Sequence, residues 1–178
     1  MDEHSVTAPG RVPLIDPCTI GFPDRTTTIA LLDSFLSSVH TIFTSVHANL
    51  CRQFYAKLFV TGVTAISDGN RVTHLAILAL GWHASMVASP LTAPFPGHPQ
   101  PQLPWADSSK PMLGEHLYKS AHDITFGTIS QSSIGALTSL ISLTLYEQTT
   151  RRFETAWAIF GICMRHAQAL RLHRELPD

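Results

Sequence analysis

The residues best able to do chemistry are ten histidines and three cysteines, and their spacing favours neither a metal site nor catalysis. His40, His47 and Cys51 fall along one edge of an expected helix. Two imidazoles two helical turns apart are about 10 Å apart, which is too far to share one ion. We therefore expect partly buried border residues there. His83, beside Trp82 in an apolar segment, is expected to be a hydrogen-bonded core histidine.

The sequence contains no motif of a known catalytic or nucleotide-binding class. A glycine-rich dinucleotide loop, a P-loop, a nucleophile elbow and an HExxH pair are all missing. Cys18, Cys51 and Cys163 are widely spaced and form no CxxC pair. This excludes a disulfide framework and a cysteine-rich zinc site in the chain. We expect no catalytic residue, no cofactor and no metal, and hence no enzyme.

The composition points to a protein that relies on partners. It is 44% apolar and only 14% charged, with a formal net charge of −1, whereas globular proteins usually have about 25% charged residues. Arg151–Arg152 is the only tight basic cluster, so direct DNA contact is not expected. The amino terminus lacks a signal-peptide pattern. The most apolar run, 75–88, is shorter than the roughly 20 residues of a membrane span, so a soluble intracellular protein is expected.

The element pattern predicts an all-α fold, an irregular bundle of about six helices. Residues 1–25 are expected to be an extended or disordered lead-in, and residues 26–178 a single domain. A long loop, 89–111, interrupts that domain, because its seven prolines are incompatible with a helix or a central strand.

Helical periodicity and capping residues place the individual helices. Asp24 is expected to cap a helix that continues through Thr41 and Thr44 to Val46, with a bend at 47–49. The stretch 68–70 reads as a turn before a central, fully buried helix, 73–88. Further helices are expected over 112–128, ending near Gly127, and over 134–146, capped by Ser132–Ser133.

The last helix, from residue 153, carries an apolar stripe that we expect to lie in the core. Arg171 would point into that stripe, so the helix should end near Leu170, with Arg171 in the left-handed region and Leu172 packing back. Arg165 is expected to pair with Glu154 or Glu147. The stripe consists of Phe153, Ala156, Trp157, Phe160, Cys163, Met164, Ala167 and Leu170.

The stretch from Ala156 to Glu175 resembles the signature of the fungal-specific transcription factor domain, approximately AW-x-x-x-G-x-A-x-R-x-A-x-x-L-G-L-H-R-E. Two positions depart from it: Cys163 replaces a small residue, and Arg171 replaces a glycine. Weaker similarity extends upstream over 32–59, 75–81 and 134–146. The residues that match the signature are Trp157, Gly161, Arg165, Ala167, Leu170, Leu172, His173, Arg174 and Glu175.

This resemblance implies the regulatory middle region of a zinc-cluster transcription factor, located in the nucleus. It implies the amino-terminal part of that region, with zinc and DNA handled by a six-cysteine module that is missing from this chain. The expected partners are other parts of a transcription factor, a homodimer partner or the transcriptional machinery. His173 and Arg174 are expected to cap the last helix, with Glu175 as their ion-pair partner. Two alternatives stay open: a stand-alone helical interaction domain, and a helical enzyme or lipid-binding fragment.

Overall fold

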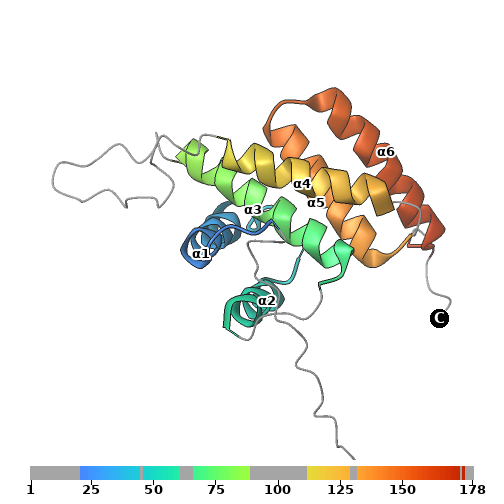
Figure 1. The fold of residues 1–178 in the computed structure, drawn as a ribbon. Helices are drawn as coiled ribbons and strands as arrows, with labels where there is room; N and C mark the ends of the chain where they lie inside the picture. Colours follow the sequence, from blue (N-terminus) through green and yellow to red (C-terminus); the bar gives the residue numbers. More distant parts are fainter. Residues whose placement is uncertain are drawn as a thin grey trace, which may run out of the picture.

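The computed structural model of the chain describes residues 21–44, 46–60, 66–88, 112–128, 132–172 and 174. All regular structure in these residues is helical, which confirms the expected all-α class (Figure 1). The predicted lead-in up to residue 20 and most of the predicted loop 89–111 lie outside the described residues. The elements are α1 (Arg25–Ser34), the π-helical η2 (Phe35–Val39), α2 (Ala48–Val60), α3 (Asp68–Ala88), α4 (Leu113–Thr128), α5 (Ile134–Thr149) and α6 (Phe153–Ala169).

Helix α3 is the centre of the fold, as the sequence predicted, but it is not buried over its whole length, because Met86 is 47% and Val87 53% exposed. Every side chain from Val72 to Leu80 is buried, and α3 packs against α1, η2, α4 and α5. At Gly81 the backbone of α1 lies so close that an added Cβ would collide with the carbonyl oxygen of Leu31. At Gly114 an added Cβ would collide with the Trp82 indole, so glycine lets α4 approach α3 there. Two glycines therefore bring two helices against the central one.

The amino-terminal helix differs from the expectation in its extent. Asp24 does cap α1, with Oδ1 accepting the Thr27 N–H at 3.0 Å, but the regular helix ends at Ser34 and a π-helical turn follows. The chain leaves the helix at His40, so the predicted continuation through Thr41 and Thr44 was wrong. The hydroxyl of Thr41 donates to the carbonyl of Ser38 at 2.8 Å, which fits the tendency of threonine to bond locally. Three apolar residues of this stretch, Ile29, Ile42 and Phe43, are exposed.

Helix α3 also begins earlier than predicted, because the stretch 68–70 forms its first turn and not a separate loop. Ser67 precedes it, and its Oγ lies 3.4 Å from the N–H of Asn70, in a capping position. Asp68 stands in the first turn, where a carboxylate is favoured by the helix dipole. The physical reason for the misassignment is that Asp and Asn favour turns and helix starts alike.

Helices α4 and α5 agree well with the sequence expectation. Ser133 caps α5, with Oγ accepting the N–H of Ala136 at 3.0 Å. Leu140 and Tyr146 are buried on α5, whereas Ile134 at its start is 59% exposed, and Leu117 with Ala121 are buried on α4. None of the described helices combines the length and apolarity that crossing a bilayer requires.

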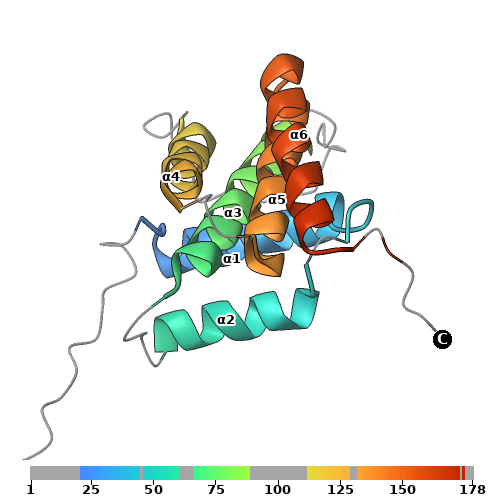
Figure 2. The same ribbon diagram turned by 90° about the vertical axis from the view of Figure 1, so that its right-hand side faces the viewer.

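Helix α2 lies on the side of α3 away from α6, as two views of the ribbon show (Figure 2). An aromatic cluster holds it there: the Phe54 ring stacks on the His74 imidazole at 3.7 Å, and Phe22 contacts Phe54 and Tyr55. The Tyr55 hydroxyl donates to the backbone carbonyl of His74 at 3.2 Å. The face of α2 toward the core consists of Cys51, Tyr55 and Leu58, whereas Leu50 is exposed.

Candidate functional site

A short turn between α5 and α6 sets the direction of the last helix. Arg151 adopts a left-handed conformation (φ 63°). Its N–H donates to the carbonyl of Gln148 at 3.1 Å, and the N–H of Arg152 donates to the carbonyl of Glu147 at 2.9 Å. This pair of bonds is the Schellman motif, which satisfies the last carbonyls of a helix. The motif places the Arg152 side chain beside α4 and α5.

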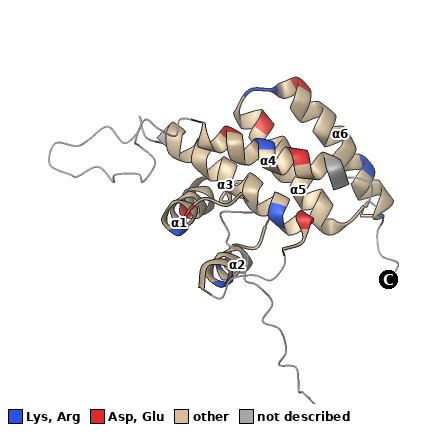
Figure 3. Cartoon of the chain, in the orientation of Figure 1, with Lys and Arg blue, Asp and Glu red and all other residues tan. Residues whose placement is uncertain are grey.

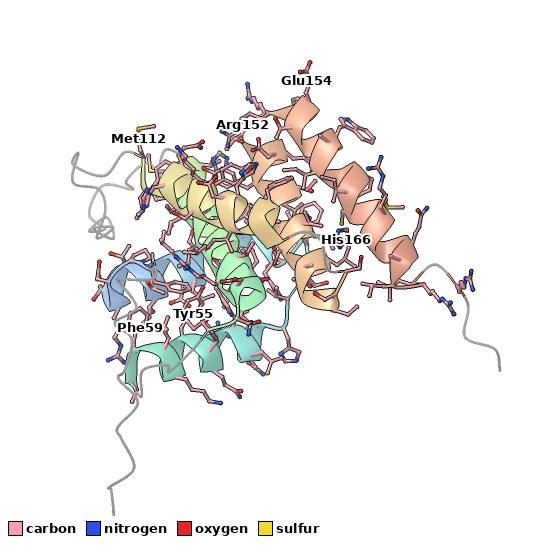
Figure 4. The ribbon with its side chains drawn as sticks, turned by 45° about the vertical axis from the view of Figure 1, so that its right-hand side comes forward. Tyr55, Phe59, Met112, Arg152, Glu154 and His166 are labelled. Atoms are coloured by element: carbon pink, nitrogen blue, oxygen red, sulfur yellow. The ribbon has the colours of Figure 1, made fainter. Side chains whose placement is uncertain are left out.

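Arg152 joins three helices through its guanidinium. Its Nη1 and Nη2 donate to the two carboxylate oxygens of Glu115 on α4, at 2.8 and 3.2 Å. Its Nε lies 2.6 Å from Oε2 of Glu147 on α5, close enough for an ion pair although not aligned as a hydrogen bond. The guanidinium also lies over the rings of Tyr118 and Tyr146, at 5.0 and 5.6 Å. The labelled Arg152 points away from α6 toward these helices (Figure 4).

The electrostatics of this cluster favour a fixed ion pair. The hydrogen bonds from Arg152 lower the pKa of Glu115, against the opposing effect of partial burial. Burial, aided by Glu147, raises the pKa of Tyr118, and burial with the charge of Glu115 raises that of Tyr146. The tyrosines therefore stay neutral. With both carboxylates engaged by one cation, the cluster fixes the start of α6 against α4 and α5.

Helix α6 has two different faces. The inner face, defined by Ala156, Ile159, Cys163 and His166, is buried against α5. The outer face, defined by Phe153, Trp157, Phe160 and Met164, is exposed to 58%, 73%, 42% and 46%. Phe153, Trp157, Phe160 and Met164 were expected in the core, and that expectation was wrong.

The outer face of α6 is an apolar stripe with a hollow at one end. Trp157 and Phe160 contact each other edge to face, with ring centroids 6.0 Å apart. A hollow of about 220 Å³ lies beside them, lined by Gln148, Phe153, Ala156, Trp157 and Phe160. Large exposed apolar patches on soluble proteins mark interaction sites. An aromatic stripe with an adjacent hollow can bind apolar side chains or small apolar molecules by burial.

The structure brings part of the signature onto this surface. Trp157, Gly161 and Arg165 follow each other at four-residue intervals and are all exposed. Ala167 and Leu170 are partly buried, and Arg174 is exposed. His173 and Glu175 lie outside the described residues, so their expected roles stay predictions.

The end of α6 adopts the backbone expected from its sequence. Arg171 is left-handed (φ 59°). Its N–H donates to the carbonyl of Gln168 at 2.9 Å, and that of Leu172 to Ala167 at 3.1 Å. This is a second Schellman motif with arginine at the position that favours glycine. The expectation that Leu172 packs back was wrong, because this residue is 54% exposed.

Two other expectations about polar side chains can be compared with the structure. Glu147 pairs with Arg152, so it is not the partner of Arg165, which is exposed and makes no ion pair with any described residue. His83 is partly buried 6.4 Å from the Tyr146 ring, and no hydrogen bond of its imidazole is present among the described residues. Burial lowers the pKa of His83.

Of the expected border residues of the amino-terminal part, His40 and His47 line one hollow, and the three residues differ in burial. Nε2 of His40 lies 2.8 Å from the carbonyl of Val46, His47 is exposed, and Cys51 is buried. No group of three or more His, Cys, Asp or Glu side chains that could hold a metal is found in the described part of the chain.

Sequence reasoning missed the outer face and the Arg152 cluster, although both left a signal. Helix α6 is apolar on nearly every side, and its small and medium residues (Ala156, Ile159, Cys163) form a stripe separate from the large ones. Such a helix must contact something on two sides. For the cluster, Glu147 follows a long apolar run, and a buried carboxylate needs a cation nearby.

One comparison with known proteins identifies a family. The family model described as "Fungal specific transcription factor domain" matches residues 32–178. No curated protein and no solved structure matches the chain.

Proposed function

The chain belongs to the fungal-specific transcription factor domain family, and we propose that it is a regulatory segment of a transcription factor that acts in the nucleus through protein contacts. The family is not one of enzymes. The match to residues 32–178 carries the proposal.

The distribution of charge supports a regulatory and not a DNA-reading role. Basic residues are distributed over several of the described helices and lie among acidic ones (Figure 3). Proteins that bind DNA directly neutralise several phosphates with clustered Lys and Arg. In this proposal DNA is contacted by a separate module, with zinc held by a cysteine cluster of that module, and this chain needs no cofactor.

The outer face of α6 is the part of the molecule best suited to the proposed contacts. It exposes three aromatic rings and a methionine in one stripe, and aromatic residues with methionine are enriched at protein interfaces. The partners we propose are other parts of a transcription factor, a second copy of the chain, or the transcriptional machinery.

A reporter assay tests the proposal. The full chain, fused to a heterologous DNA-binding domain in a fungal cell, is expected to change reporter expression relative to that domain alone. The double variant Trp157→Ala/Phe160→Ala should abolish the change, whereas Ile42→Ala, an equally exposed apolar residue elsewhere, should not.

Two results would overturn the proposal. One is a reporter level identical with and without the chain, at equal protein abundance; this would favour a helical interaction domain without a role in transcription. The other is exclusion of the tagged chain from the nucleus.

A further inference from the structure

The spacing of the outer face of α6 is the same in both directions along the helix. Phe153, Trp157, Phe160 and Met164 are separated by four, three and four residues. The 4-3-4 spacing is that of the seam of an α-helical coiled coil. Because the spacing is palindromic, a two-fold axis midway between positions 157 and 160 places residue 153 opposite 164, and 157 opposite 160. The stripe is thus complementary to itself in an antiparallel arrangement, as a two-fold interface requires.

The charges of α6 fit the same arrangement. Glu154 and Arg165 are the only charged residues of the helix apart from histidine, and they lie near its opposite ends (Figure 3). Within one copy they are eleven residues apart, about 16 Å along the axis, too far to pair. Neither makes an ion pair with a described residue.

In the antiparallel arrangement these two charges meet across the interface. The same two-fold axis places position 163 of one copy opposite Glu154 of the other. Arg165 of the first copy is two residues further on, so it lies about 3 Å from that level, measured along the helix. With 100° of rotation per residue, the side chains of Glu154 and Arg165 lie on the same side of Trp157, within about 80° of it around the helix. A two-fold axis perpendicular to both helices places this side of one helix next to the same side of the other. Each end of the interface would therefore hold one Glu–Arg pair, whereas in a parallel arrangement Glu154 of one copy and Arg165 of the other would stay eleven residues apart along the helices and could not pair.

The surface around the stripe allows close approach of a second helix. Gly161 is exposed on the same side as these charges, and nothing lies within 4 Å of the place where its Cβ would stand. The hollow beside Phe153, Trp157 and Phe160 can receive an apolar side chain from the second copy. In both ribbon views α6 is the outermost helix on its side of α5 (Figures 1 and 2).

We propose that the outer face of α6 is a self-association surface, on which a second copy of this chain packs its own α6 antiparallel with paired Glu154 and Arg165. The inference rests on the geometry of α6 and is independent of the role in transcription.

Sedimentation equilibrium of the full chain tests the apolar part of this interface. The wild-type chain should be in monomer–dimer equilibrium. Trp157→Ala should raise the dissociation constant at least tenfold, since central aromatic residues dominate such interfaces. Ile42→Ala, exposed outside the face, should leave it unchanged. A wild-type chain that is monomeric at all concentrations, or a dimer that Trp157→Ala leaves unaltered, would overturn the proposal.

Charge reversal tests the antiparallel direction without removing apolar area. Glu154→Arg and Arg165→Glu should each weaken the dimer roughly threefold to tenfold, because each places two like-charge pairs in the interface. The double variant Glu154→Arg/Arg165→Glu should restore the wild-type constant. Single effects that add in the double variant, or that are missing altogether, would contradict the antiparallel pairing. Both charges are exposed, so these variants should fold as the wild type does, and their unfolding free energies check this.

Discussion

Helices α3 and α6 are both rich in apolar residues, yet the middle of α3 is enclosed and α6 is covered on one face only. The side chains from Val72 to Leu80 are all buried among four neighbouring elements. On α6, by contrast, Ile159 is 2% exposed and Trp157, two residues away, is 73% exposed. An apolar sequence thus indicates that a helix needs to be covered on several sides. It does not indicate whether the covering residues belong to the same chain or to another molecule. For α6 we assign the second contact to another molecule.

The same substitution in the two helices should have opposite effects, and this is the largest difference we expect. Gly81→Ala forces a methyl group into the Leu31 carbonyl and should cost about 3 kcal/mol of unfolding free energy or more. Gly161→Ala adds a methyl group in open space and should stabilise the monomer by about 0.5–1 kcal/mol through helix propensity. Urea titration at low protein concentration measures both. A destabilising Gly161→Ala would show that the outer face is covered within the monomer.

The Arg152 cluster should account for the next largest effect, because it fixes the covered face of α6. Arg152→Ala leaves the buried carboxylate of Glu147 without its cation. We expect a loss of about 2–3 kcal/mol, at the lower end for a broken buried pair because the Arg152 side chain is partly exposed. Removing Glu115 with Arg152 should cost less than the sum of the two single losses. Thermal or urea unfolding that is unchanged in Arg152→Ala would exclude this role.

Mild acid should weaken the α2–α3 contact. Burial lowers the pKa of His74 to about 3 in the folded chain, whereas unfolded histidine has a pKa of about 6.5. Below pH 6.5 the unfolded chain therefore takes up a proton that the folded chain does not. Stability should fall by about 1.4 kcal/mol per pH unit from pH 6.5 toward pH 3.

His74→Leu provides the control for this pH dependence. This variant places an apolar side chain against Phe54 and removes the titrating group. Its unfolding free energy should therefore fall less steeply as the pH is lowered, by the roughly 1.4 kcal/mol per pH unit assigned to His74. Equal slopes for the variant and the wild-type chain would mean that His74 does not carry the effect.

A smaller effect than that of the buried histidine is expected at the end of α6. Arg171 is left-handed, a conformation that costs a residue with a Cβ roughly 1 kcal/mol relative to glycine. Arg171→Gly should therefore raise the unfolding free energy by about 1 kcal/mol, and Arg151→Gly should do the same at the end of α5. A loss of stability in either variant would argue for an ion pair or contact that the arginine makes in solution.

The sequence predicts much of this fold because its signals are local. The caps at Asp24 and Ser133, the buried run of α3 and the left-handed Arg171 follow from residues within one or two turns. The errors arise where the outcome depends on distant residues. The π-helical turn after Ser34 and the exposed Ile42 reflect how the chain crosses α3. The outer face of α6 was predicted to be core because helical periodicity shows which residues are apolar, and it does not show which side of the helix contacts another element.

The family signature was readable from sequence, but the placement of its residues was not. Trp157 is the clearest case: its position in the stripe is consistent with core packing and with exposure alike. Only the tertiary arrangement, with α5 on the opposite side of α6, distinguishes the two. The link from Arg152 to Glu115 spans 37 residues, so spacing alone offered no reason to pair them.

The most direct test of the two-faced α6 compares Trp157→Ala with Ile159→Ala in urea unfolding of the full chain, at concentrations where it is monomeric. We expect Ile159→Ala to lose about 3 kcal/mol, as for a buried isoleucine, and Trp157→Ala to lose less than about 1 kcal/mol, as for a surface residue. A loss in Trp157→Ala as large as that in Ile159→Ala would contradict the account, because it would place the tryptophan in the core.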